Sequence, residues 1–96
     1  MKTTQDRIDE IMDNFDFKKV EQTMKALDWK WGMADSIPEE YELRREARRL
    51  LKDVASENVR ESDLRYAVAT GGFKATKYFD GGLELEFIVT SWDTNE

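Results

Sequence analysis

Apolar residues in the first half of the chain recur every three or four positions, as in helices that bury one face. This spacing predicts a first helix from about Thr4 to Asp13, with an apolar face formed by Ile8, Ile11, Met12 and Phe15. A second helix is predicted to follow at once, because Asp16 can accept hydrogen bonds from the free amides of a first helical turn. This helix is expected to end near Asp28, and its buried stripe consists of Val20, Met24 and Leu27.

A third and longer helix is predicted from about Ile37 to Ser56. Residues 36–39 have the spacing of a capping box that begins at Ser36, and the proline at position 38 is tolerated in a first helical turn. The apolar face of this helix is formed by Leu43, Ala47, Leu50, Leu51 and Val54. Ahead of it, residues 29–32 alternate as an extended segment would.

In the last third of the chain the apolar period changes from about 3.6 to about 2 residues, which is typical of strands. Three alternating runs are separated by the glycine pairs Gly71-Gly72 and Gly81-Gly82, as in hairpin turns. Helices followed by strands predict an α+β fold. We expect one domain spanning residues 1–96, in which three N-terminal helices pack on a three-stranded antiparallel β-meander.

The faces of the strands also predict their register. A two-residue turn at the first glycine pair sets Thr70 opposite Phe73 and keeps apolar residues together. A three-residue loop at 80–82 does the same in the second hairpin, where it sets Phe79 opposite Leu83. The residues expected to be buried together are Leu43, Leu50, Val54, Val68, Leu85 and Phe87.

Lys77 is an exception to this pattern, because the register places it on the core face of the second strand. A lysine can bury its aliphatic stem while its ammonium group stays in a polar environment. We therefore expect the side chain of Lys77 to extend to an edge or an end of the sheet.

Composition narrows the class of protein. Hydrophobic residues make up 40% of the 96-residue chain, which is too many for a disordered segment. The chain contains no cysteine and no histidine, which excludes disulfides, thiolate chemistry and zinc sites of the Cys/His kinds. Without disulfides, an apolar signal segment or a run long enough to span a bilayer, we expect a cytoplasmic protein that does not enter a membrane.

The net charge is −6, from 21 acidic and 15 basic residues. Binding to the phosphates of DNA or RNA requires a basic surface, so direct nucleic-acid binding is not expected. An acidic chain is suited to a partner protein with a basic surface. Its oligomeric state stays open, with a homodimer among the alternatives.

Basic residues line one side of the predicted third helix, opposite its apolar face, and we call them the basic stripe: Arg44, Arg45, Arg48, Arg49 and Lys52. Arginine side chains in such an arrangement can bind phosphate or carboxylate groups. The alternative is a solvated helix face, in which the same side chains pair with Glu42 and Glu46 three or four residues away. We favour the solvated face.

Acidic residues cluster near the N-terminus, at Asp6, Asp9, Glu10, Asp13 and Asp16. Several carboxylates can hold Mg²⁺ or Ca²⁺, but their spacing does not match a calcium-binding loop, so we interpret the cluster as a solvated surface. The predictions are no metal site and no cofactor. No nucleophile stands beside a base, and the chain is therefore not expected to be an enzyme.

Aromatic and apolar residues on the outer side of the predicted sheet are candidates for binding a partner. Trp92 alternates with Ile88 on that side, near Tyr78. Trp29 and Trp31 point to opposite sides of an extended segment, so one of them is expected to be exposed. The candidate partner-binding residues are Trp92, Ile88, Tyr78 and Trp31.

Three short motifs together resemble small uncharacterised proteins that many bacteriophage genomes encode. They are FDFKKV at 15–20, LDWKW at 27–31 and ATGGF at 69–73, with the last strand at 83–92. The resemblance implies a phage accessory protein that acts in the cytoplasm of the host bacterium. By analogy with other small acidic phage proteins, an inhibitor is expected.

The leading hypothesis is a non-catalytic binding protein that engages or inhibits a host or anti-phage defence macromolecule. The alternative is a small protein that binds an anionic ligand or a nucleotide on the basic stripe, with Trp29 or Trp31 as a stacking surface. A phosphohydrolase built on the acidic cluster is the least favoured reading.

Overall fold

The computed structural model describes residues 3–28, 36–59, 65–78 and 82–88. In these residues three helices precede three strands: α1 (Thr4–Asn14), α2 (Phe17–Ala26), α3 (Glu40–Ser56), β1 (Arg65–Thr70), β2 (Phe73–Tyr78) and β3 (Leu83–Phe87). The strands form an antiparallel sheet in the order β1-β2-β3. The prediction of an α+β chain with three helices ahead of a three-stranded antiparallel meander is confirmed.

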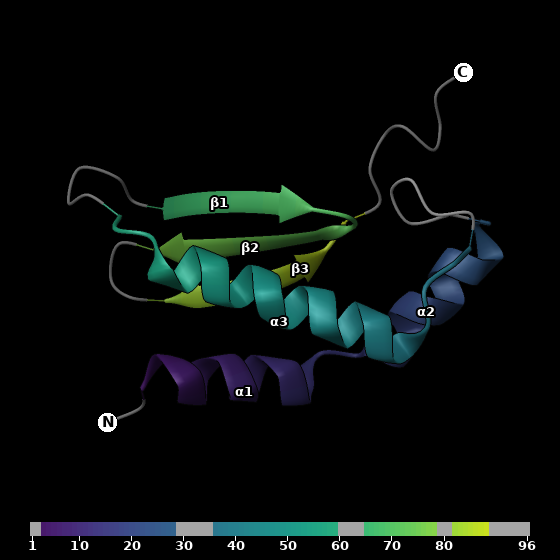
Figure 1. The fold of residues 1–96 in the computed structure, drawn as a ribbon, viewed down its shortest axis with the longest axis horizontal. Helices are drawn as coiled ribbons and strands as arrows, with labels where there is room; N and C mark the ends of the chain where they lie inside the picture. Colours follow the sequence, from purple (N-terminus) through teal and green to yellow (C-terminus); the bar gives the residue numbers. More distant parts are fainter. Residues whose placement is uncertain (1–2, 29–35, 60–64, 79–81, 89–96) are drawn as a thin grey trace, which may run out of the picture.

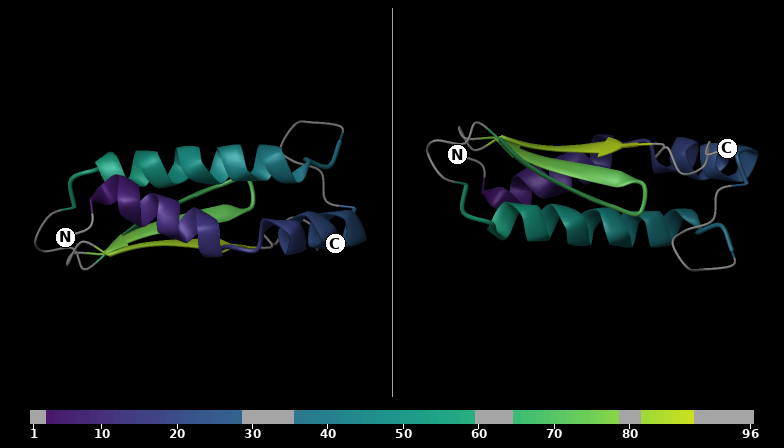
Figure 2. Two further views of the ribbon diagram at one scale, coloured as in Figure 1. Left: turned by 90° about the horizontal axis from the view of Figure 1, so that it is seen from below. Right: turned by 90° about the horizontal axis from the view of Figure 1, so that it is seen from above.

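The long helix α3 lies along one face of the sheet and contacts all three strands (Figure 1). Helix α1 lies beside α3 and contacts β3, whereas α2 packs against the first half of α3 beyond the end of the sheet. Figure 2 shows that, among the described residues, no helix covers the opposite face of the sheet. That opposite face is called the outer sheet face below.

The core forms where α3 meets the other elements. All five residues of the predicted apolar face of α3 are buried. The rest of the core comes from α1, α2, β2 and β3, and it consists of Ile8, Met12, Phe17, Val20, Met24, Phe73, Ala75, Leu83 and Leu85. Of the residues expected to be buried together, Val68 and Phe87 are only half-buried, and both pack against this core.

Aromatic rings join the junction of α1 and α2 to the sheet. The ring centroid of Phe17 lies 4.8 Å from that of Phe15 and 6.0 Å from that of Phe73. Phe73 in turn lies 5.8 Å from Phe87, with the two rings edge to face. Each such pair contributes about 0.5–1.5 kcal/mol beyond the burial of its area.

The predicted start of the third helix is wrong by three residues. The helix begins at Glu40 and is capped at Glu39, so Ser36 is not its N-cap. Pro38 explains why Ile37 is not helical, because the residue that precedes a proline is disfavoured from helical geometry.

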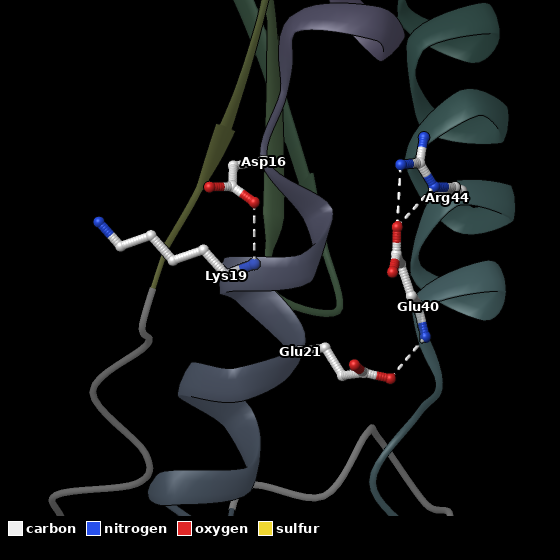
Figure 3. Close-up of polar contacts among 5 residues, drawn as sticks. All are labelled: Asp16, Lys19, Glu21, Glu40 and Arg44. Atoms are coloured by element: carbon white, nitrogen blue, oxygen red, sulfur yellow. Dashed lines mark hydrogen bonds and ion pairs between the residues drawn. The ribbon is translucent and has the colours of Figure 1, made fainter.

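Carboxylates satisfy the free amides at the start of α3. The backbone amide of Glu39 donates to the side chain of Glu42 at 2.8 Å. The backbone amide of Glu40 donates to the Glu21 carboxylate of α2 at 2.9 Å (Figure 3). The cap of this helix therefore comes partly from another helix, which the sequence of α3 does not reveal.

The first hairpin has the predicted register, with Thr70 opposite Phe73. Gly71 has a φ of 60°, a left-handed conformation that glycine adopts without strain. The predicted register of the second hairpin is wrong by two residues, because Leu83 lies opposite Lys77. A shift of two residues leaves every side chain on its own face, so the pattern of apolar and polar residues is the same in these two registers.

Lys77 lies on the core face, as predicted, and its ammonium group reaches the C-terminal end of α3. Its Nζ donates to the carbonyl oxygen of Ala55 at 2.9 Å and also to that of Glu57. Helix α3 has no basic residue in its own last turn. Lys77 therefore satisfies carbonyl groups that the helix leaves free and complements the negative end of its dipole.

We predict that Lys77→Met lowers the free energy of unfolding by about 1–3 kcal/mol, because it keeps the aliphatic stem and removes a charged donor from partly buried carbonyls. Urea denaturation followed by circular dichroism measures the change. Lys74→Met is the matched control on the same strand, since Lys74 lies on the outer sheet face, and it should change the stability by less than about 0.5 kcal/mol. Equal losses in the two variants would contradict this role for Lys77.

Candidate functional surfaces

The outer sheet face carries small and charged side chains in rows that run across the strands. One row is formed by Ala69, Lys74 and Glu86, and the next by Ala67, Thr76 and Glu84. Ala67, Ala69, Glu84 and Glu86 are exposed. Thr76, on the central strand, is only 7% exposed.

Two predicted partner-binding residues, Tyr78 and Ile88, lie on this face and are half-buried. The Tyr78 hydroxyl donates a hydrogen bond to the Glu84 carboxylate, and this bond raises the pKa of Tyr78 above its ordinary value. The amide of Ile88 donates to the carbonyl oxygen of Gly72 at 2.6 Å.

The structure does not bring these two residues together. Tyr78 is bonded to Gly82, and Ile88 lies six residues farther along the chain, so roughly 20 Å separate the two ends of the face. The other two candidates, Trp92 and Trp31, fall outside the residues that the structure describes, as does Trp29.

The basic stripe of α3 is largely paired with carboxylates. Arg44 binds Glu40 at 2.9 Å, and its guanidinium also lies 4.9 Å from the centre of the Phe17 ring. Arg49 binds Glu46 at 2.6 Å, which is one of the two partners that the sequence predicted. The other predicted partner, Glu42, instead accepts a hydrogen bond from the backbone amide of Glu39 at the start of α3.

Arg48 makes the one ion pair described here that links two helices. Its guanidinium donates to the Asp9 carboxylate of α1 at 2.8 Å, and the Gln5 side chain donates to the same carboxylate at 2.9 Å. The hydrogen bond from Arg48, followed by that from Gln5, holds the pKa of Asp9 below its ordinary value. Lys52 lies close enough to lower this pKa further.

Arg45 is exposed, and within the described part of the chain it forms no hydrogen bond or ion pair. Tyr41 lies one turn earlier on the same side of α3 and is 65% exposed. Tyr41 is not among the candidate residues predicted from the sequence, although a spacing of four residues from Arg45 places the two on one helix face.

The acidic residues near the N-terminus mostly have structural roles. Asp6 and Thr3 cap α1 reciprocally, and Asp16 caps α2 by accepting from the Lys19 amide at 3.0 Å (Figure 3). Glu10 binds Arg7 at 2.8 Å. Within residues 3–28, 36–59, 65–78 and 82–88, no three acidic groups gather in a way that could hold a metal ion.

Two surface grooves depend on contacts between distant segments, and the sequence did not indicate them. One, of about 450 Å³, lies between α3 and β1 and is lined by residues that include Arg49, Val54, Glu57, Tyr66 and Val68. The other, of about 460 Å³, lies between α2 and β3 and includes the apolar side chains Phe15, Val20, Leu85 and Phe87.

We predict that Arg48→Gln raises the pKa of Asp9 toward its ordinary value, because it removes the strongest interaction that favours the ionised carboxylate. Carboxyl chemical shifts followed by NMR through an acid titration measure the change. Arg45→Gln is the matched control and should leave the titration of Asp9 unchanged, since Arg45 does not contact it. An Asp9 curve that is identical in wild type and Arg48→Gln would refute the assignment.

The lowered pKa of Asp9 also predicts how the stability of the fold changes with pH. A carboxyl whose pKa is lower in the folded than in the unfolded chain stabilises the fold above the unfolded value, and this contribution is lost as the pH falls through the folded value. Wild type should therefore lose more stability than Arg48→Gln between neutral pH and strongly acidic pH. Urea denaturation at several pH values measures this difference.

Comparison of the chain with protein-family models, with curated proteins and with solved structures finds no match. In the part of the chain that the structure describes, none of the helices is both long and apolar enough to cross a membrane. The surfaces of the described residues are therefore the basis for inferring a function.

Proposed function

We propose that this chain is a non-catalytic binding protein that recognises a partner protein through its outer sheet face. The observation that supports this function is that no described helix covers this face, whereas α3 lies along the opposite one (Figure 2). Flat, solvent-facing sheets offer many side chains to a partner without a change in backbone conformation. Tyr78 and Ile88 provide aromatic and aliphatic contacts at its two ends.

Charge on this face indicates the chemistry of the partner. Glu84 and Glu86 are both exposed along β3. Together with the net charge of −6, they favour a partner that presents a basic patch. Surfaces of this kind occur on proteins that bind nucleic acid, so a protein partner of that class suits this chain better than nucleic acid itself.

The resemblance to bacteriophage proteins supports a biological setting for this proposal. In that setting the chain is a phage accessory protein in the host cytoplasm, and its partner is a host or anti-phage defence macromolecule that it engages or inhibits.

A second candidate function is the binding of an anionic ligand or nucleotide on α3. It is favoured by the exposure of Tyr41, which is 65% exposed and can stack on a base, beside the unpaired guanidinium of Arg45. The pairing of Arg44, Arg48 and Arg49 with carboxylates opposes it, because their charge is already neutralised.

Partner capture from a lysate of infected host cells, followed by binding measurements with the purified partner, tests the first candidate. We predict that Ile88→Asp and Glu86→Lys each weaken binding at least about tenfold, as replacements of side chains that carry much of the binding energy of an interface do. Arg45→Glu, a charge reversal at an exposed position on α3, is the matched control and should leave the affinity unchanged. Circular dichroism checks that each variant is folded.

A melting screen against nucleotides and cyclic nucleotides separates the two candidates. No shift of the wild-type melting temperature is expected. A shift of several degrees that Arg45→Glu abolishes and Ile88→Asp retains would reverse the ranking in favour of the ligand-binding function.

A further inference from the structure

We propose that β1 pairs with β1 of a second copy of this chain, so that two sheets join into one antiparallel sheet across a two-fold axis. This inference goes beyond the proposed function and uses a different surface, the free edge of β1 and the groove beside it. It rests on the hydrogen-bonding direction of β1, on the groove between α3 and β1, and on the charges at the rim of that groove.

Backbone hydrogen bonds reveal which groups face the free edge. Tyr78 donates to Gly82 at 2.9 Å and Ile88 to Gly72 at 2.6 Å, so even-numbered residues of β2 face β3. Odd-numbered residues of β2 therefore face β1, where their partners have even numbers. The amides and carbonyls of residues 65, 67 and 69 consequently point away from the sheet, and all three residues are exposed.

This edge has few of the features that prevent strands from pairing with other chains. Natural edge strands are protected by proline, bulges, lysine or a covering segment. In β1 there is no proline, its pairing with β2 runs without interruption over six residue pairs, and Arg65 is its sole charged residue. Among the described residues, none lies beyond β1 at this edge (Figure 1).

A second copy of this chain fits the free edge of β1, because an edge strand can form antiparallel hydrogen bonds with an identical strand. In a two-fold interface each residue contacts the same patch on the other subunit. A register centred on Val68 sets this residue opposite Val68 of the partner subunit. In this register the backbone of Ala67 also forms hydrogen bonds with the backbone of Ala69 of the partner subunit. Val68, half-buried in one copy, then becomes covered on its open side.

The same register sets the charged side chains at the rim of the groove against those of the partner subunit. Lys77 bonds to the carbonyl of Glu57 and lies opposite Tyr66, so the end of α3 lies level with Tyr66. Arg49 lies eight residues earlier, about 12 Å along a helix that runs antiparallel to β1, near the level of Thr70. The two-fold axis reverses this order, so Arg49, which already pairs with Glu46 of its own helix, comes level with Glu57 of the partner subunit.

This charge pair occurs twice, once on each side of the axis, because the interface is symmetric. Between the two pairs, the groove is lined by the apolar side chains of Leu50, Val54, Tyr66 and Val68 and also by the carboxylate of Asp53, which lies 4.0 Å from Arg49 of its own chain. Because Asp53 lies midway between Arg49 and Glu57 on α3, it comes level with Asp53 of the partner subunit, and this like-charge contact opposes the pairing. Tyr66 is 38% exposed in the single chain, which is high for a large aromatic side chain that lies beside the core. The dimer covers this exposed surface.

Sedimentation and cysteine crosslinking test the interface. The chain has no cysteine, so Val68→Cys introduces a single thiol. In an antiparallel pair without direct hydrogen bonds, opposite Cα atoms lie about 4.5 Å apart, within the range that a disulfide bridges. We predict that wild type sediments at twice the mass of the chain and that oxidised Val68→Cys forms a covalent dimer. Glu84→Cys, on the outer sheet face, is the control and should stay uncrosslinked.

Ala67→Pro removes an amide that faces the free edge, so the pairing of β1 with β2 keeps all its bonds. It should raise the dissociation constant of the dimer at least tenfold, and Ala67→Thr, which retains the amide, should not. Arg49→Glu and Glu57→Arg should each weaken the dimer, whereas the double variant should restore it. This restoration tests the two-fold pairing even where Ala67→Pro affects folding.

A wild type that is monomeric at hundreds of micromolar would overturn the proposal. So would a dimer that Ala67→Pro and the charge reversals leave unchanged, or crosslinking of Glu84→Cys in place of Val68→Cys. If the wild type is monomeric and Ala67→Pro loses partner capture, the edge binds a strand of another protein and the second copy is excluded. Ile88→Asp separates this proposal from the proposed function, because it should leave the dimer intact.

Discussion

Burial of the apolar face of α3 is the interaction on which the rest of the structure depends. This helix contacts all three strands and both other helices, so it is the element that all the others share as a neighbour. Full burial of a leucine or valine contributes about 1.5–3 kcal/mol, and α3 buries four such side chains together with Ala47. The polar bonds at its two ends, from Glu21 and Lys77, contribute about 1–3 kcal/mol each, which is less than the four apolar side chains contribute together. Apolar burial therefore holds α3 against the sheet, and the bonds at its ends fix its position along the sheet.

This arrangement of α3 explains where the chain can interact with other molecules. Since α3 lies along one face of a small sheet, the outer sheet face and the edge at β1 stay open among the described residues. The basic stripe lies on the solvent side of α3, where Glu40, Glu46 and Asp9 neutralise three of its arginines. Two of these arginines thus pair within α3, and Arg48 links α3 to α1. Glu84 and Glu86, in contrast, remain exposed on the outer sheet face.

The sequence predicted those features that depend on nearby residues. The apolar face of α3 and the cap at Asp16 follow from periods and short spacings, and both are found as expected. The register of the second hairpin was wrong because shifts of two residues look alike in a face pattern, and contacts such as that of Phe73 with Phe87 distinguish them. The partner of Lys77 and the groove between α3 and β1 join segments about 20 residues apart, so no local pattern reports them. Tyr41 could have been found, because its spacing from Arg45 is local.

The two proposed surfaces are geometrically compatible, and together they have a consequence for affinity. A two-fold axis that joins two β1 strands within one sheet stands perpendicular to that sheet. Both outer sheet faces then lie on the same side of the dimer, next to each other and without a helix between them. A partner that presents two basic patches can bind both faces at once, and linked sites of this kind strengthen binding by about 10²–10⁴-fold without any new contact. An interface of modest area on each chain is therefore sufficient for a tight complex, provided that the partner is itself symmetric or carries a repeated surface.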